Sequence, residues 1–152
     1  MPHLVRSILV VAGASVMAAA RPQAPPNVLD LVVVNGPFTG TYRPPTSEVV
    51  CMHSKKDRIY TAAWRDFNPH STRAVGEAGI NVSNPDDPGP KVGEVLISFG
   101  ERDKNPTVFR VDPAPITLTI KGKGAEISFQ GKTKEGIQLR VSAKCLDVVE
   151  VK

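Results

Sequence analysis

The sequence has few of the residues from which catalytic and metal centres are usually built. Among 152 residues there are 2 Cys, 3 His and 1 Trp, and aromatic residues make up 5%. It also has no Gly-x-Ser-x-Gly nucleophile elbow and no glycine-rich phosphate loop that leads into a helix. The length fits one domain, which excludes an enzyme with separate cofactor and substrate domains. These absences favour a non-catalytic protein that needs no cofactor.

No apolar run after residue 20 is long enough to cross a membrane as a helix. The first twenty residues have Arg6 near the start, an apolar stretch from Ile8 to Ala19, and three alanines before Arg21. This pattern predicts a secretory signal peptide cleaved after Ala20, with an uncleaved N-terminal anchor as the alternative. Residues 21–27 contain three prolines and are expected to form an extended leader. The mature chain is then secreted, or lies in the periplasm or cell envelope.

From Val28 onward, apolar residues recur with the period of two that is typical of half-buried strands. The clearest run alternates apolar and polar side chains from Ile137 to Cys145. Turn residues separate such runs, for example at Asn35-Gly36-Pro37 and Asp112-Pro113. We therefore expect residues 28–152 to form one antiparallel β-sandwich, immunoglobulin-like or with another Greek-key order. The segment from Phe67 to Gly79 has the least pattern and could hold a short helix.

Cys51 and Cys145 are the only cysteines, and export would place both in an oxidising compartment. Cys145 continues the apolar side of its strand, and Cys51 shares a side with Val49. We therefore predict that the two form one disulfide inside the fold. The alternative is a copper site at Met52 and His53, because thioether and imidazole both bind copper. Consecutive strand residues point to opposite faces, which disfavours that site.

No group of residues predicts catalysis. His53 and His70 are each followed by serine, but sequence neighbours do not form a catalytic triad, and a surface imidazole explains each histidine. The acidic pair Asp86-Asp87 lacks the ligand pattern of a calcium loop. We expect no enzyme activity and no resident metal.

The basic residues do not predict a nucleic-acid partner. The formal net charge is only +4, and acidic residues interrupt most basic groups. Lysines at 121, 123, 132 and 134 lie in expected turns and could attract anionic surfaces weakly if the fold gathers them at one end.

Tyr60 and Trp64 have the same strand parity and could form a stacking ledge for a ligand, although burial in the core also explains them. Asn81-Val82-Ser83 is an N-glycosylation sequon, which matters only in a source that glycosylates such sites.

Three segments carry a resemblance to a known family. They are Val49-Val50-Cys51, the stretch from Asn84 to Phe99, and the ending from Glu126 to Cys145. Together they resemble the mycobacterial 19 kDa lipoprotein antigen family. The resemblance implies a paired set of cysteines and a cell-envelope protein that acts as an antigen or adhesin without known enzyme activity. The chain departs from that family because no lipid-accepting Cys follows the signal peptide.

The leading hypothesis is therefore a non-catalytic, secreted or envelope-associated binding protein. Its partner is an unidentified surface or protein, and the chain itself is expected to be monomeric. A second hypothesis is a carrier for a small sugar or lipid, with Trp64 and Tyr60 lining a gap between sheets. A third is a copper-binding periplasmic protein that uses Met52 and His53.

Overall fold

A computed structural model describes residues 26–66, 74–101 and 104–152 of the chain. The expected signal peptide and most of the leader, as well as His70, lie outside the described residues. Within them the protein is all-β, and no helix is long and apolar enough to cross a membrane. The strands are β1 (Val28–Val33), β2 (Gly40–Tyr42), β3 (Val49–Ser54), β4 (Ile59–Arg65), β5 (Val75–Ser83), β6 (Lys91–Phe99), β7 (Thr107–Lys121), β8 (Gly124–Lys132), β9 (Gln138–Cys145) and β10 (Val148–Val151), with a 3-10 turn, η1 (Thr46–Glu48), before β3.

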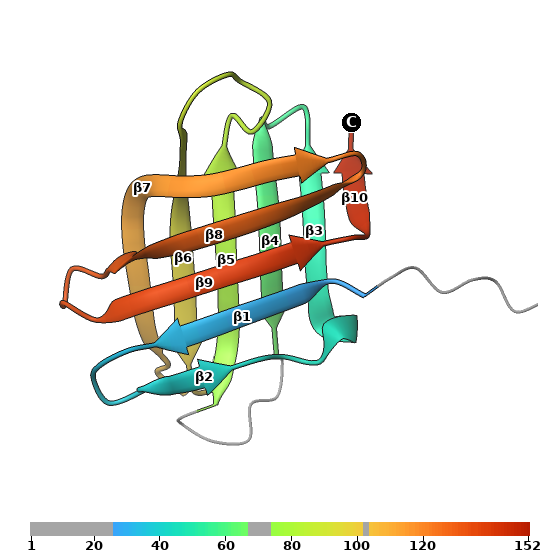
Figure 1. Ribbon diagram of the computed structural model, residues 1–152. Coiled ribbons are helices and arrows are strands. Elements are labelled where there is room, and N and C mark those ends of the chain that lie inside the picture. The colour runs from blue at the N-terminus through green and yellow to red at the C-terminus, as the bar shows by residue number, and fades with distance from the viewer. Residues whose placement is uncertain (1–25, 67–73, 102–103) are drawn as a thin grey trace, which may run out of the picture.

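The ten strands form one continuous sheet in the order β10-β3-β4-β5-β6-β7-β8-β9-β1-β2. The sheet curls into a half-barrel, so that β7, β8, β9, β1 and β2 form one layer in front of β3, β4, β5 and β6, and the strands of the two layers cross steeply (Figure 1). All pairings are antiparallel except that of β10 with β3. The predicted all-β class is confirmed. A sandwich of two separate sheets is not confirmed, because a single sheet supplies both layers.

The period-two pattern of the sequence decides which side chains enter the core. In β9 every second residue, from Leu139 to Cys145, is buried, and the residues between them are exposed. The same alternation in β1 buries Leu29, Leu31 and Val33 against the opposite layer. Apolar side chains from both layers therefore fill the space inside the curl.

Strand β7 makes the corner between the two layers. Its first part pairs with β6, and its last five residues, from Thr117, pair with β8. Between Val111 and Ala114 the register against β6 shifts by one residue, which places a bulge at Asp112-Pro113. The sequence interpretation put a turn at Asp112-Pro113, and this is wrong. Proline lacks the N–H of a ladder hydrogen bond, and a bulge tolerates that loss while bending the strand.

Two further strands were not expected. Val75–Ser83 forms β5, although its first residues belong to the segment in which a short helix was considered. The chain ending also adds β10, whose partner β3 lies nearly one hundred residues earlier. The first part of the segment from Phe67 to Gly79 lies outside the described residues.

The disulfide between Cys51 and Cys145 is confirmed. It joins β3 in one layer to the end of β9 in the other, with the two α-carbons 5.9 Å apart. Both side chains are fully buried. The bridge closes a loop with a sequence separation of 94, which is worth about 4 to 5 kcal/mol in the chain-entropy description.

Asn27 is a second connection at the same end of the molecule. Its buried side-chain amide donates to the backbone carbonyls of Val49 (3.2 Å) and Asp147 (2.8 Å). Its Oδ1 accepts from the backbone N–H groups of Leu146 (2.8 Å) and Asp147 (2.9 Å). One side chain therefore ties the starts of β1 and β3 to the β9–β10 connection. The sequence interpretation assigned Asn27 to the leader and missed this role.

Candidate ligand-binding face

The two aromatic residues considered as a ligand ledge both lie on the core side of β4. Tyr60 is 2% exposed and Trp64 is 8% exposed. The indole N–H of Trp64 donates to Glu48 Oε2 at 3.0 Å. The hydroxyl of Tyr60 has no hydrogen-bond partner among the described residues, and burial raises the Tyr60 pKa to about 12. Neither ring lines any of the four surface hollows described below.

Met52 and His53, the copper candidates, point to opposite sides of β3. His53 is buried on the core side, where its Nε2 lies 3.0 Å from Asp86 Oδ2 and its ring lies beside that of Tyr60. Met52 is half-buried on the outside and lines a hollow there. Among residues 26–66, 74–101 and 104–152, no three His, Cys, Asp or Glu side chains are grouped so that they could hold a metal ion.

The serine after His53 does not act with it. Ser54 Oγ donates to Asp57 Oδ2 at 2.7 Å, within the β3–β4 turn. The acidic loop is likewise engaged by protein groups, since Asp86 meets His53 and Asp87 accepts two hydrogen bonds from Arg58. The fold thus brings His53 and the acidic loop together. The contact between His53 and Asp86 attaches this loop to the end of β3.

The turn lysines do not gather at one end. Lys121 and Lys123 flank the start of β8, whereas Lys132 and Lys134 lie at its end. Lys121 also pairs with Glu126 at 3.0 Å, and Lys134 pairs with Asp112 at 2.8 Å. A basic surface made of these four residues is therefore excluded by the direction of β8.

Surface hollows instead concentrate on the outside of the front layer. We call this side the outer face, and it consists of the outward side chains of four adjacent strands: Thr117 and Thr119 on β7; Glu126, Ser128, Gln130 and Lys132 on β8; Gln138, Arg140, Ser142 and Lys144 on β9; and Val28, Asp30 and Val32 on β1. Three hollows of about 330, 590 and 230 Å³ lie along it. Neighbouring hollows share lining residues, so they form one trough.

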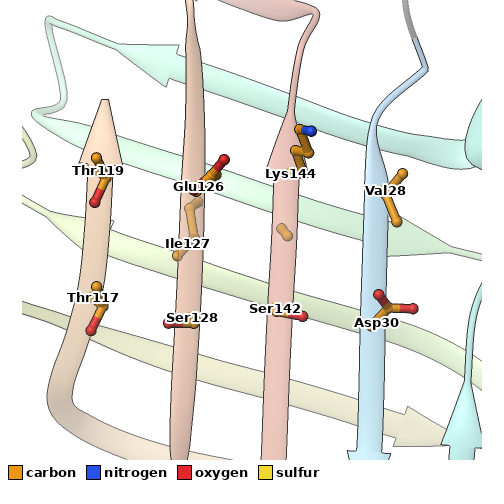
Figure 2. A pocket seen from close by; sticks show the side chains of 10 residues that line it. Val28, Asp30, Thr117, Thr119, Glu126, Ile127, Ser128, Ser142 and Lys144 are labelled. Carbon is orange, nitrogen blue, oxygen red and sulfur yellow. The ribbon is translucent and has the colours of Figure 1, made fainter. Parts of the chain in front are cut away.

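The register of the strands explains why the outer face is hollow. Thr117, Ser128, Ser142 and Asp30 are direct partners across β7, β8, β9 and β1. Figure 2 shows these four side chains in one row, above which Thr119, Glu126, Lys144 and Val28 form the next. The short side chains of the first row leave space beside the longer ones, and a third row with Gln130 and Arg140 lies between the second and third hollows.

The Asp30 carboxylate at the end of the hydroxyl row has a cationic partner. Arg43, just after β2, donates its Nε–H to Asp30 Oδ1. This hydrogen bond and the opposite charge hold the pKa of Arg43 above its ordinary value. Asp30 Oδ1 is therefore already engaged by Arg43 at the edge of the trough.

A fourth hollow of about 330 Å³ lies outside the other layer. It contains Asn81 of the sequon, whose Oδ1 accepts a hydrogen bond from Thr61 Oγ1 at 2.8 Å. Asn81 is exposed, but this hollow shares no lining residue with the three hollows of the trough.

Sequence reasoning missed the members of the trough. The alternation within single strands did identify Ser128, Arg140 and Ser142 as polar, solvent-facing residues, which is correct. Their alignment depends on the order and register of β7, β8, β9 and β1, and a single strand pattern carries neither.

Comparisons with known proteins add no relative to this description. No protein-family model matches the chain, and neither a curated protein nor a solved structure matches it.

Proposed function

We propose that this chain is an exported, non-catalytic binding protein that contacts its ligand through the trough of the outer face. The observation that carries the proposal is the continuity of three hollows on one face, two of which lie over a row of side-chain hydroxyls and a carboxylate. Such groups can donate and accept hydrogen bonds to a polar ligand without changing it. The described residues present no nucleophile paired with a base at this face.

Export supports the same proposal. A buried disulfide between distant strands is typical of secreted and periplasmic proteins. The N-terminal pattern predicts cleavage after Ala20, so N-terminal sequencing of the exported protein is expected to begin at Arg21. The resemblance to the mycobacterial 19 kDa lipoprotein antigens would add a place in the cell envelope, and membership of that family stays a proposal.

The carrier hypothesis has less support. Tyr60 and Trp64 lie within the packed core, and Trp64 already uses its only donor on Glu48. A ligand between the layers would have to separate them, against the disulfide that joins β3 to β9.

Two matched threonines of β7 provide the test. Thr117 lies in the trough, whereas Thr107 is also exposed but lines none of the four hollows. Binding of the purified protein to a panel of neutral and acidic polysaccharides is measured by affinity electrophoresis. Thr117→Tyr fills the trough and is expected to weaken binding at least tenfold, whereas Thr107→Tyr leaves it within twofold. Equal binding by both variants, or conversion of a bound polysaccharide into products, would refute the proposal.

A further inference from the structure

On the outer face the acidic side chains have ion-pair partners, whereas several basic side chains have none among the described residues. Both of its acidic residues have basic partners, since Asp30 pairs with Arg43 and Glu126 pairs with Lys121. Three basic residues of the face, Lys132, Arg140 and Lys144, have no carboxylate within ion-pair distance among the described residues. The face therefore offers uncompensated positive charge.

These free cations border the trough along its whole length. Lys144 lines the first hollow, Arg140 lines the second and third, and Lys132 lines the third. Arg140 and Lys144 are four residues apart on β9, which separates their α-carbons by about 13 Å. Ser142 lies between them and exposes its hydroxyl to the same hollows.

We infer that the ligand of this trough is an acidic polysaccharide, with carboxylate groups bound by Arg140 and Lys144 and sugar hydroxyls bound by the row of Thr117, Ser128 and Ser142. The inference rests on the proposed function and names its ligand class. Arginine binds a carboxylate through two parallel N–H donors, which gives the contact direction as well as strength. The hydroxyl row supplies both donors and acceptors, as the hydroxyls of a sugar chain require.

The spacing favours a polymer over a small anion. A chain with repeated charges reaches both cations while their side chains remain extended. A single phosphate or sulfate would need the side chains of Arg140 and Lys144 to fold over Ser142 against their mutual repulsion.

The composition of the face favours a polysaccharide over the other anionic polymers. Sequence-tolerant binding of single-stranded nucleic acids depends on aromatic side chains that stack on bases, and the outer face has none. An acidic peptide would be held through apolar anchors as well as charge. The apolar residues that reach the surface of the trough are few and lie at its two margins, with Val28, Val32 and Val34 on the β1 side and Pro115 on the β7 side.

The test separates removal of charge at the trough from removal of charge elsewhere. Arg140→Gln/Lys144→Gln removes two positive charges at the trough, and Lys55→Gln/Lys56→Gln removes two at the exposed β3–β4 turn. Binding of the purified protein to alginate, a polymer of uronic acids, is titrated at low and high salt, with dextran as the neutral polymer. Equal midpoints of urea unfolding confirm that the variants are folded.

Alginate is expected to bind more weakly as salt rises, and dextran at least tenfold more weakly than alginate. The trough variant is expected to lose at least tenfold in alginate affinity, and the turn variant less than threefold. Equal losses in the two variants, or no alginate binding, would overturn the inference. Comparable or tighter binding of polyglutamate, single-stranded DNA or inorganic phosphate would overturn the polysaccharide class. Dextran binding that equals alginate binding and is abolished by Thr117→Tyr would overturn the inference while leaving the proposed function intact.

Discussion

The side chain of Asn27 offers a direct test of how the half-barrel is held closed at one end. Its four hydrogen bonds link the start of β1 to Val49 and to the backbone of Leu146 and Asp147. Asn27→Ala removes all four and leaves two backbone N–H groups and two carbonyls without this partner. Asn27 is 8% exposed, so solvent replaces these bonds incompletely.

The expected loss follows from the net value of each bond. An intramolecular hydrogen bond contributes about 0.5 to 1.5 kcal/mol net, which gives about 2 to 6 kcal/mol for the set. Leu146 and Asp147 are partly exposed, and water can satisfy some of the groups that remain. We therefore expect Asn27→Ala to lower the free energy of unfolding by about 2 to 4 kcal/mol.

Urea unfolding monitored by Trp64 fluorescence measures this loss, provided that the m-value is unchanged. Asn35 provides the matched control, because its exposed side chain also bonds backbone groups, at Gly136 and Gln138. Asn35→Ala is expected to cost less than about 1 kcal/mol, since water replaces exposed bonds. A loss below about 1 kcal/mol for Asn27→Ala, or equal losses for both variants, would refute the reasoning.

Three further predictions concern the core. The native, unreduced protein is expected to have no free thiol, and replacing Cys51 and Cys145 by alanine should lower the free energy of unfolding by about 2 to 5 kcal/mol; two titratable native thiols would contradict this. A Cβ at Gly93 would lie 2.1 Å from the carbonyl oxygen of Asn81, whereas at Gly79 it would meet nothing closer than 3.4 Å. Gly93→Ala is therefore expected to destabilise by more than about 2 kcal/mol, and Gly79→Ala to change stability by less than about 1 kcal/mol, in urea unfolding. Because burial raises the pKa of Tyr60 to about 12, its folded form stays neutral after the unfolded chain ionises, so stability should fall as pH rises from about 10 to about 12. Tyr60→Phe should remove most of that fall; an unchanged pH profile would contradict the assignment.

The sequence predicted the features that depend on one strand at a time. Parity identified the buried side of β9 correctly and placed Cys51 and Cys145 inward, where they meet. It could not place β10 beside β3, because a parallel pairing between distant segments produces no recognisable pattern in the local sequence. It also misread Asp112-Pro113, since the same dipeptide suits a turn and a bulge, and the partner strand decides between them.

The candidate site was harder to predict than the fold. Trp64, Tyr60, Met52 and His53 were candidates because aromatic and metal-binding residue types often form sites. Three of them, Trp64, Tyr60 and His53, are buried in the interior of the fold. The trough consists of common polar residues whose alignment exists only in the assembled sheet.

The central claim is that the outer face binds the ligand, and amide chemical shifts test it most directly. Isotope-labelled protein is titrated with short alginate oligomers, and the shifts are mapped residue by residue. We expect the largest changes at Ser128, Arg140 and Ser142. Changes confined instead to the opposite layer, around Thr61 and Asn81, would contradict the account.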